Sequence, residues 1–346
     1  MLRLPKFKYL HPKNIAEAVR MRADHGPEAM FVAGGTDLYP NMKRRQQTPA
    51  VVIGLGHLDK LRSVRGTVKD GLVLGASLTL TEVCENRKIR KAYPAVARAA
   101  ELVSTPLLRN MGTIGGNLLL DTRCNYYDQS YEWRKAIHFC MKKDGDICWV
   151  APSSPRCWAV QSSDSVPVMV AIGAKVKLVS PEGERVISAA ELYNDDGINH
   201  LNKKPNELLT EIQLPATNGW RATYWKLRRR DSFDFPVLGV ATWLRVAPDG
   251  TVEDARIFLG GVGSHPIDAR KTVEAIRGRK LDEQLIDEAA GLAYPVAKPL
   301  DNTDFAMAWR KDMARYYVAG TLRELAGIPL KHAESKNGSH PTLRVL

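Results

Sequence analysis

The sequence predicts an α+β fold made of two or three packed subdomains. Up to residue 219, short apolar strand patterns alternate with helical periodicity, and three strand patterns followed by three helical patterns occupy the rest of the chain. A chain of 346 residues can bury a large core, and 44% hydrophobic with 25% charged residues is typical of a soluble globular protein. We therefore expect the chain to fold without disulfide cross-links.

The N-terminal part is predicted to begin with a short extended segment, 7–10, and a helix, 14–25. Asn14 is a favoured N-cap residue, and Glu17 follows it with the spacing of a capping box. Gly26 comes directly after the last helical position. These signals together predict where the first helix begins and ends.

A glycine-rich turn follows a predicted buried strand at 29–32 and reads AGGTDL over 33–38. Because Gly34 and Gly35 have no Cβ, the backbone amides of such a turn can point at a phosphate group. On these residues alone, a plain tight turn between a strand and a helix is the alternative. Two G-x-G pairs occur, at 54–56 and 261–263, but neither is followed by the residues that complete the fingerprint G-x-G-x-x-G. A nicotinamide-binding Rossmann domain is therefore not supported.

A second glycine-rich turn, RNMGTIGGN over 109–117, comes after two predicted strands and two predicted helices. The strands are expected at 50–54 and 72–75, and the helices at 79–85 and 94–103. Two such turns are more specific than either turn alone, because together they can hold the two phosphates of one pyrophosphate.

Four of the five cysteines follow the second turn with the spacing C-x15-C-x7-C-x8-C, at Cys124, Cys140, Cys148 and Cys157. Thiolate ligands suit an iron–sulfur cluster or tetrahedral zinc, whereas disulfides are not expected in a reducing cytoplasm. None of the four belongs to a C-x2-C pair of the kind found in many structural zinc sites. On spacing alone, an iron–sulfur cluster, zinc and free buried thiols all remain open. Cys84 is predicted to be an inert thiol on a buried helix face.

The chain after the cysteines is predicted to enter a C-terminal subdomain near Trp220. Strands are expected before that point at 168–172, 174–179 and 208–215. Beyond it we expect three antiparallel strands, at 220–228, 237–246 and 255–260, and then helices at 268–276, 281–292 and 305–325. The predicted division of the chain is 1–57, 58–219, 220–328 and a tail at 329–346.

The formal net charge of +12 is compatible with nucleic acid, an acidic partner or an acidic small molecule. The basic residues are dispersed in clusters at 43–45, 87–91 and 226–230, without a zinc-finger, helix-turn-helix or RNP pattern, so we expect no nucleic-acid partner. No apolar run is long enough for a signal peptide or a membrane span, and we expect a cytoplasmic protein with no membrane segment. No catalytic triad, H-E-x-x-H motif or paired-carboxylate pattern stands out, which favours an electron relay without catalytic residues of its own.

The two glycine turns, together with LLTEIQLP at 208–215 and YWKLRRRDSFDFP at 224–236, closely resemble the FAD-binding medium subunit of the molybdenum hydroxylases. This is the family of xanthine dehydrogenase and carbon monoxide dehydrogenase, and the resemblance covers residues 5–327. Most members run almost directly from the second turn to a Ser-Asp element that is similar to Ser163-Asp164 here. In this chain an insertion at about 122–161 intervenes and holds the four cysteines. That insertion resembles the β subunits of the 4-hydroxybenzoyl-CoA reductases, whose extra loop carries a [4Fe-4S] cluster.

The resemblance implies a set of cofactor contacts. The implied FAD contacts are Ala33, Gly34, Gly35, Thr36, Asp37, Leu38, Thr113, Gly115, Gly116, Asn117, Asp121, Asp164, Leu209 and Lys226. The implied ligands of the [4Fe-4S] cluster are Cys124, Cys140, Cys148 and Cys157. Lys226 is expected near the isoalloxazine, where a fixed positive charge stabilises an anionic reduced flavin. Asn117 and Asp121 either bond the cofactor or only brace the loop.

The resemblance also implies the fold, the partners and the reaction. The fold would combine two FAD-binding subdomains of the PCMH, or vanillyl-alcohol-oxidase, type with a C-terminal three-stranded antiparallel sheet and helix bundle. The partners would be a molybdopterin-bearing catalytic subunit and a small [2Fe-2S] subunit in a dimer of heterotrimers, with a ferredoxin as electron donor. The complex would convert 4-hydroxybenzoyl-CoA to benzoyl-CoA. Two alternatives stay open: a related hydroxylase subunit serving another aromatic or aldehyde substrate, and a zinc-stabilised nucleic-acid-binding or scaffold protein.

Overall fold

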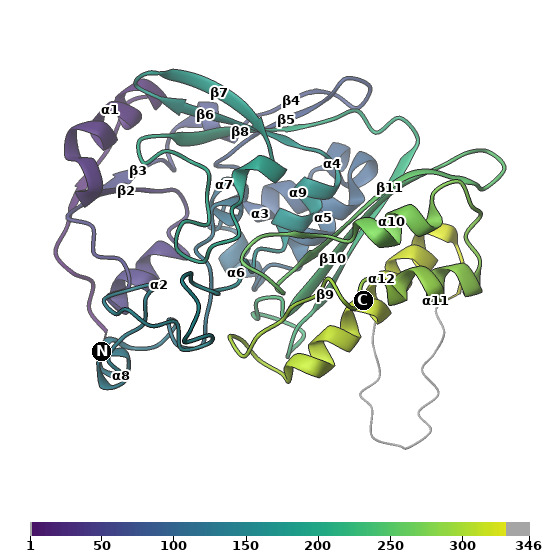
Figure 1. Cartoon of the computed structure of the whole chain (residues 1–346). Coiled ribbons are helices and arrows are strands. Elements are labelled where there is room, and N and C mark those ends of the chain that lie inside the picture. Colours follow the sequence, from purple (N-terminus) through teal and green to yellow (C-terminus); the bar gives the residue numbers. More distant parts are fainter. Residues whose placement is uncertain (1, 330–346) are drawn as a thin grey trace.

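The computed structural model describes residues 2–329 (Figure 1). Its N-terminal part forms a three-stranded sheet in the order β1-β3-β2, with parallel neighbours. Its elements are β1 (Lys8–Leu10), α1 (Ile15–His25), η1 (Gly26–Glu28), β2 (Ala29–Val32), α2 (Leu38–Lys43) and β3 (Val51–Gly54). The predicted cap of the first helix is confirmed, because the Asn14 side chain accepts a hydrogen bond from the Glu17 amide at 2.9 Å. α1 buries Ala18 and Val19 against the sheet.

A five-stranded antiparallel sheet follows, in the order β4-β5-β8-β6-β7. Its strands are β4 (Val64–Thr67), β5 (Gly71–Gly75), β6 (Lys175–Ser180), β7 (Gly183–Ser188) and β8 (Leu208–Leu214), with the short helices η2 (Asp59–Arg62) and η3 (Ala190–Leu192) beside them. The helices of this region are α3 (Leu80–Glu85), α4 (Arg87–Ala92), α5 (Pro94–Glu101), α6 (Pro106–Arg109), α7 (Ile114–Leu118), α8 (Tyr131–Ala136) and α9 (Ser165–Ala171). α3 begins with a complete capping box between Thr79 and Glu82.

The strand predicted at 168–172 is wrong, because this segment belongs to α9. Every residue of α9 is buried, since the helix lies between the five-stranded sheet and the C-terminal sheet. A short helix that is apolar on all sides has no polar face, and in sequence it cannot be told from a buried strand.

The C-terminal sheet has the order β12-β11-β10-β9 and is antiparallel. Its strands are β9 (Trp220–Leu227), β10 (Leu238–Val246), β11 (Val252–Gly260) and β12 (Ile267–Asp268), and the helices that follow are α10 (Arg270–Ile276), α11 (Glu283–Gly291) and α12 (Met307–Ala326). The three predicted strands are present, and β12 adds a fourth at the edge. Two residues are too few to leave a strand pattern in the sequence.

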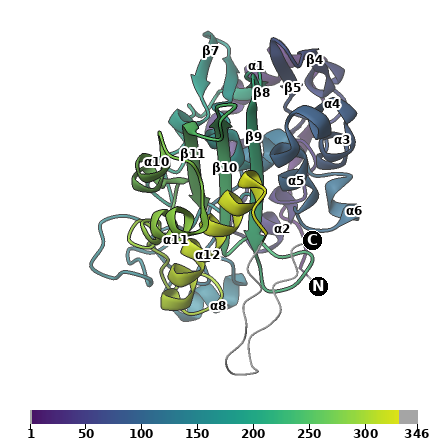
Figure 2. The same ribbon diagram turned by 90° about the vertical axis from the view of Figure 1, so that its right-hand side faces the viewer.

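The C-terminal sheet has helices on both faces (Figures 1 and 2). α5 and α9 lie between it and the five-stranded sheet, whereas α10, α11 and α12 cover the opposite face. Tyr224 and Trp243 from the C-terminal sheet share one hydrophobic core with Leu72 and Val176 from the five-stranded sheet. The two sheets and the helices between them therefore pack as one continuous body.

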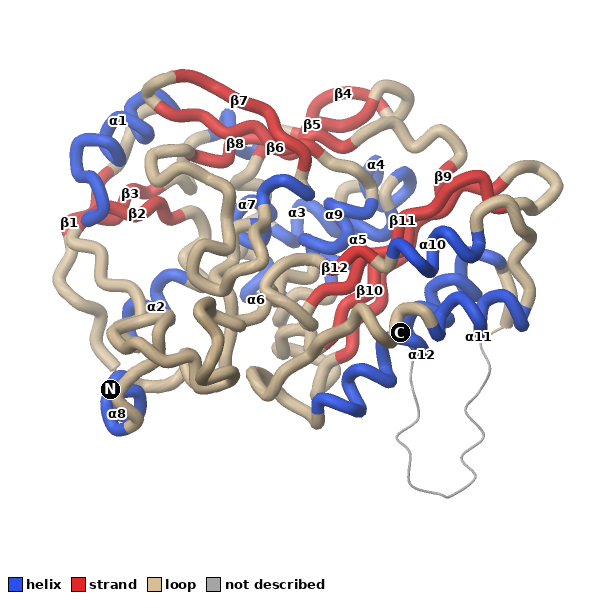
Figure 3. The backbone as a smooth tube through the Cα atoms, in the orientation of Figure 1, coloured by secondary structure: helices blue, strands red, loops and turns tan. Residues whose placement is uncertain are grey.

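The cysteine-bearing insertion consists mainly of loops around the short helix α8 (Figure 3). It contacts the N-terminal part, where Gln46 Nε2 donates to the Tyr127 carbonyl at 2.6 Å. It also contacts the C-terminal part, where the Asn125 amide donates to the Asn302 carbonyl at 2.9 Å. The predicted tail lies almost entirely outside the described residues. Among the helices of residues 2–329, none combines the length and apolar character needed to cross a membrane.

Candidate functional site

The two glycine-rich turns touch each other. A Cβ added at Gly34 would overlap the carbonyl oxygen of Met111, and a Cβ added at Gly112 would lie 3.3 Å from the hydroxyl oxygen of Thr36. Gly35 has a φ of 70°, a left-handed conformation that favours glycine. A side chain at Gly34 would therefore push the second turn away from the first.

The backbone amides of the first turn are available to a ligand. Within residues 2–329, the N–H groups of residues 34–37 donate to no protein acceptor, and these residues are only partly buried. Successive free amides in a turn with a left-handed residue form a concave anion-binding site. The first turn therefore fits a phosphate group of a nucleotide cofactor, as its sequence predicts.

The second turn is held close to the five-stranded sheet. The Gly115 amide donates to the Ala76 carbonyl at 2.8 Å, and a Cβ at Gly115 would lie only 2.7 Å from the Ala76 Cβ. Thr113 opens α7 and accepts a hydrogen bond from the Gly116 amide at 3.1 Å. Gly115 thus permits the close approach of this turn to Ala76 at the end of β5, whereas Gly116 contributes its amide to the cap at Thr113.

Asn117 braces the start of α9. Its Oδ1 accepts the Ser163 hydroxyl at 2.7 Å and the Ser165 amide at 3.3 Å. The side chain joins the second glycine turn to the Ser-Asp element that follows the insertion. For this oxygen atom, bracing the loop is the role that the geometry supports.

Asp164 and Lys226 form a buried ion pair between α9 and β9. Lys226 Nζ lies 2.9 Å from Asp164 Oδ2 and donates to the Leu102 carbonyl at 2.9 Å, while the Tyr224 hydroxyl donates to Asp164 Oδ1 at 2.8 Å. Burial raises the pKa of Asp164 and lowers the pKa of Lys226, and the attraction between the two charges opposes both shifts. Leu209, 2% exposed on β8, belongs to the same core as Tyr224.

Arg123 joins the first glycine turn to the insertion. Its Nη2 pairs with the Asp37 carboxylate, and its Nη1 lies 3.2 Å from Asp128 Oδ1. Asn41 Nδ2 donates to the other oxygen of Asp37 at 3.0 Å, so both oxygens of this carboxylate have partners within the protein. Burial raises the pKa of Asp37, although Arg123 opposes that shift. The Arg123 guanidinium also lies over the ring of Phe235, with its carbon 4.5 Å from the ring centroid.

Asp121 holds the base of the insertion. Its Oδ1 lies 2.8 Å from Lys142 Nζ, and its Oδ2 accepts the Tyr127 hydroxyl at 3.0 Å. Burial alone would raise the pKa of Asp121, but Lys142 and Tyr127 bring it below its ordinary value. Lys142 Nζ also donates to Thr122 Oγ1 at 2.8 Å and to the Gly197 carbonyl at 2.6 Å.

The four cysteines of the insertion line one small cavity. They come from four separate loop positions and are all buried, at Cys124, Cys140, Cys148 and Cys157, with Lys142 in the same wall. Burial raises the pKa of Cys124 to about 12 and that of Cys157 to about 11, so a metal would have to displace protons from these thiols. Four soft donors around one cavity fit the ligand chemistry of an iron–sulfur cluster or of zinc.

Cluster ligation by these cysteines stays a prediction. In the described part of the chain, no group of three or more His, Cys, Asp or Glu side chains is arranged so that it could hold a metal ion. The cysteines are free thiols that surround the cavity.

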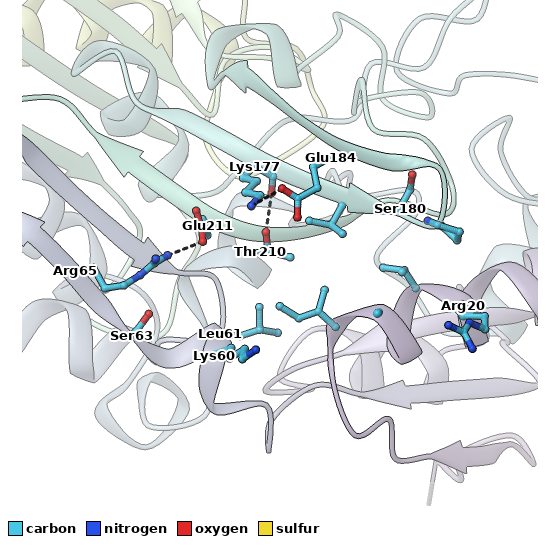
Figure 4. Close-up of a pocket in the computed structure, with 15 residues that line it drawn as sticks. Arg20, Lys60, Leu61, Ser63, Arg65, Lys177, Ser180, Glu184, Thr210 and Glu211 are labelled. Carbon is cyan, nitrogen blue, oxygen red and sulfur yellow. Dashed lines mark hydrogen bonds and ion pairs between the residues drawn. The ribbon is translucent and has the colours of Figure 1, made fainter.

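A separate cavity of about 700 Å³ lies between α1 and the five-stranded sheet (Figure 4). Its walls carry the ion pair of Arg65 with Glu211, at 2.5 Å, and that of Lys177 with Glu184, at 2.6 Å. Its lining shares no residue with the glycine turns or with the cysteines. This cavity is therefore distinct from the candidate site.

Sequence reasoning missed three side chains that organise the site. Arg123 binds Asp37, Lys142 binds Asp121, and Tyr224 binds Asp164. Arg123 and Tyr224 carried a signal in the sequence, because Arg123 stands in the DTRC motif beside the first cysteine of the insertion and Tyr224 is the first residue of YWKLRRRDSFDFP.

The paired glycine turns, with the free amides of the first turn, define a protein that binds a phosphate-bearing cofactor. Residues 5–217 match the family described as the FAD binding domain in molybdopterin dehydrogenase, and residues 222–325 match the CO dehydrogenase flavoprotein C-terminal domain. The chain therefore belongs to the FAD-binding medium subunits of the molybdenum hydroxylase family, which are oxidoreductase subunits. The predicted α+β fold, with its FAD-binding part and flavoprotein C-terminal part, is confirmed.

Individual relatives agree with this assignment. The aldehyde oxidoreductase FAD-binding subunit of Escherichia coli is 34% identical over 272 residues, which are 75% of this chain and 82% of the relative. The carbon monoxide dehydrogenase medium chain of Afipia carboxidovorans is 28% identical over 309 residues, 89% of this chain and 92% of the relative. A solved structure of Cu,Mo-CO dehydrogenase superposes with a TM-score of 0.77 at 26% identity, over 94% of this chain and 99% of that chain.

Proposed function

We propose that this chain is the FAD- and [4Fe-4S]-binding electron-transfer subunit of a molybdenum-containing reductase of the 4-hydroxybenzoyl-CoA reductase type. The observation that supports this proposal is the insertion at about 122–161, whose four buried cysteines meet at one cavity. Through Arg123, the same insertion contacts the first glycine turn. When bound, the cluster would supply one-electron transfer, and FAD would supply both one-electron and two-electron transfer.

The residues of the chain have distinct roles in this proposal. The free amides of 34–37 bind the pyrophosphate of FAD, together with the second turn at 113–117. The four cysteines hold the cluster, and the Lys142 ammonium in the cavity wall offsets part of the negative charge that four thiolates bring. Lys226, whose Nζ lies 2.9 Å from Asp164 Oδ2, provides a positive charge near the isoalloxazine.

The resemblance to the 4-hydroxybenzoyl-CoA reductases also implies the proposed partners. The chain receives low-potential electrons from a ferredoxin at the insertion and passes them to a small [2Fe-2S] subunit and a molybdopterin-bearing catalytic subunit. These subunits form a cytoplasmic dimer of heterotrimers. Relatives named medium chain or FAD-binding subunit support a multi-subunit organisation. The complex combines 4-hydroxybenzoyl-CoA with two electrons and two protons to give benzoyl-CoA and water, a reduction for which an additional low-potential centre is suited.

The decisive experiment is anaerobic purification of the full chain followed by iron, sulfide, zinc and flavin analysis, repeated on Cys148→Ala. We expect about four iron and four sulfide per wild-type chain, because a cubane with four thiolate ligands contains that number. The variant should lose the iron and sulfide and keep about one FAD, since the amides at 34–37 lie outside the insertion.

Cys84→Ala is the matched control for this experiment. Cys84 is also a buried thiol, but it lies on α3 and its Sγ bonds the Thr81 carbonyl at 3.4 Å, away from the insertion. Its iron content should equal that of the wild type. Zinc in place of iron and sulfide in the wild-type chain would contradict the proposal, as would a chain without metal after anaerobic handling.

A second candidate function is favoured by the 34% identity to the aldehyde oxidoreductase FAD-binding subunit of Escherichia coli. In that case the chain would serve a molybdenum enzyme that oxidises an aldehyde or another aromatic compound. Assays on the assembled complex separate the two candidates. Benzoyl-CoA formation from 4-hydroxybenzoyl-CoA with a reduced low-potential donor supports the first, whereas aldehyde-dependent dye reduction without benzoyl-CoA formation supports the second.

A further inference from the structure

We infer that Arg123 is a positioning residue that couples the cysteine cavity to the first glycine turn. Through this residue, an ordered cysteine cavity raises the affinity of the turn for FAD. This inference rests on the proposed function in one respect, that the first turn binds FAD beside an ordered cysteine insertion. The Arg123 side chain is 13% exposed and has contacts in three parts of the chain. These contacts are with Asp37 of the first turn, Asp128 of the insertion and Phe235 of the C-terminal part.

A continuous set of polar contacts runs from the cysteine cavity to the flavin turn. The Cys124 amide donates to Asp128 Oδ2 at 3.2 Å, and the other oxygen of Asp128 lies 3.2 Å from Arg123 Nη1. The other end of the same guanidinium pairs with Asp37, which precedes α2. Because the guanidinium is planar and rigid and contacts both carboxylates, a change in the position of Cys124 also changes the position of Asp37.

Neither carboxylate has another cation as its ion-pair partner among the described residues. Both carboxylates are partly buried, with the Asp37 and Asp128 side chains 29% and 23% exposed, and Arg123 is the cation that they share. Without the guanidinium, two partly buried carboxylates would face each other, with Asp121 also nearby. The first turn and the insertion would then repel each other instead of being held together.

The test is a double-mutant cycle on the dissociation constant of FAD. FAD is titrated into the deflavinated full chain of the wild type, Arg123→Met, Cys148→Ala and the double variant, and binding is followed by quenching of flavin fluorescence. We expect Arg123→Met to raise the dissociation constant at least about tenfold and Cys148→Ala to raise it several-fold, within the usual range of coupling between sites. The double variant should bind no more weakly than Arg123→Met, because the contact through which the cavity acts is already lost.

The cycle is compatible with a Cys148→Ala chain that retains its FAD during purification. A several-fold weaker dissociation constant leaves a tightly bound flavin at full occupancy when FAD is in excess. Occupancy and affinity therefore report different properties of the variant.

Arg156→Met is the matched control. Arg156 is also an insertion arginine with an ion pair, to Asp195 at 2.9 Å, and an aromatic contact, over Trp158 at 3.6 Å. It has no contact with the flavin turns in the described structure, so its FAD affinity should equal that of the wild type. Asp128→Asn keeps the arginine and removes only the insertion half of the bridge. It should raise the dissociation constant by less than Arg123→Met, and it provides the test if the arginine variant does not fold.

Wild-type affinity in both Arg123→Met and Asp128→Asn would overturn the inference. So would an unchanged affinity in Cys148→Ala, or effects of Arg123→Met and Cys148→Ala that simply add. A wild-type affinity in Asp128→Asn combined with a large loss in Arg123→Met would make Arg123 a direct FAD ligand and would also overturn it. Failure of this inference can be distinguished from failure of the proposed function. The iron and sulfide content of the wild type tests the proposed function, whereas the FAD dissociation constants of the cycle test the inference.

Discussion

The ion pair of Asp164 and Lys226 is the most buried charged contact of the flavin region, with side chains 3% and 1% exposed. A buried pair is costly to desolvate, and its net contribution to stability is small when both partners are present. The contact becomes important when one partner is removed, because the other charge then stays in the core without compensation. Lys226 would retain only the Leu102 carbonyl as an acceptor.

We predict that Asp164→Asn lowers the free energy of unfolding by about 3–5 kcal/mol, as expected for a buried charge left unpaired. The amide keeps an acceptor for the Tyr224 hydroxyl, so the loss reports mainly on the ammonium of Lys226. Asp164→Asn combined with Lys226→Met should recover most of this stability. Urea unfolding of the three proteins measures both effects, and a change below about 1 kcal/mol in Asp164→Asn would contradict the argument.

The double variant also tests the predicted role of Lys226 toward the flavin. The double variant differs from Asp164→Asn only at Lys226, and loss of a nearby positive charge disfavours an anionic reduced flavin. The midpoint potential should therefore be lower in the double variant than in Asp164→Asn. A redox titration of the bound flavin measures that potential. An unchanged potential would restrict Lys226 to a structural role.

Single residues show where sequence reasoning stops. Asp37 and Asp121 were predicted as FAD contacts, and their carboxylates prove to be held by Arg123 and Lys142. The Arg123 pair joins residues 86 positions apart in sequence, and such a distant partner leaves no periodic or local signal. Motifs can therefore indicate that a residue belongs to a site without indicating which atoms it contacts.

At the scale of elements, the close packing of the two glycine turns is the feature that needs particular residues. Gly34→Ala places a methyl group against the Met111 carbonyl, and the turns have to separate to make room for it. We predict a loss of FAD affinity of at least about tenfold, equal to about 1.4 kcal/mol. Gly56→Ala is the control, because the nearest atom to its added Cβ is the Ala33 carbonyl oxygen at 3.8 Å. Equal FAD affinities of the two variants, measured by fluorescence titration, would show that turn contact is not required.

Elements with local signals were predicted well, and elements defined by their surroundings were not. The capped helix α1 and the three long C-terminal strands have periodicity, caps and turns that the sequence displays. α9 has none of these, since its Asp164 N-cap makes no side-chain capping bond and all its residues are buried. Its helical form depends on the two sheets that enclose it, which is information that lies in the rest of the chain.

At the scale of the whole molecule, the FAD-binding part and the C-terminal part are joined by a shared core. Trp243 of β10 is 2% exposed, stacks on Trp220 with ring centroids 5.5 Å apart, and belongs to the core that includes the five-stranded sheet. Two parts that share a core of this kind cannot separate without exposing it. Loss of the C-terminal sheet should therefore also release the flavin.

We predict that flavin release and loss of tryptophan burial occur in one urea-induced transition, because neither part keeps its core alone. Trp243→Ala should lower the free energy of unfolding by about 3–5 kcal/mol through the cavity that it leaves, and should shift both signals together. Trp133→Ala, on α8, removes a side chain that is 39% exposed and should therefore cost clearly less stability than Trp243→Ala. If flavin fluorescence and tryptophan emission followed separate transitions in the wild type, the two parts would be independent folding units, and the shared core would not be the contact that keeps FAD in place.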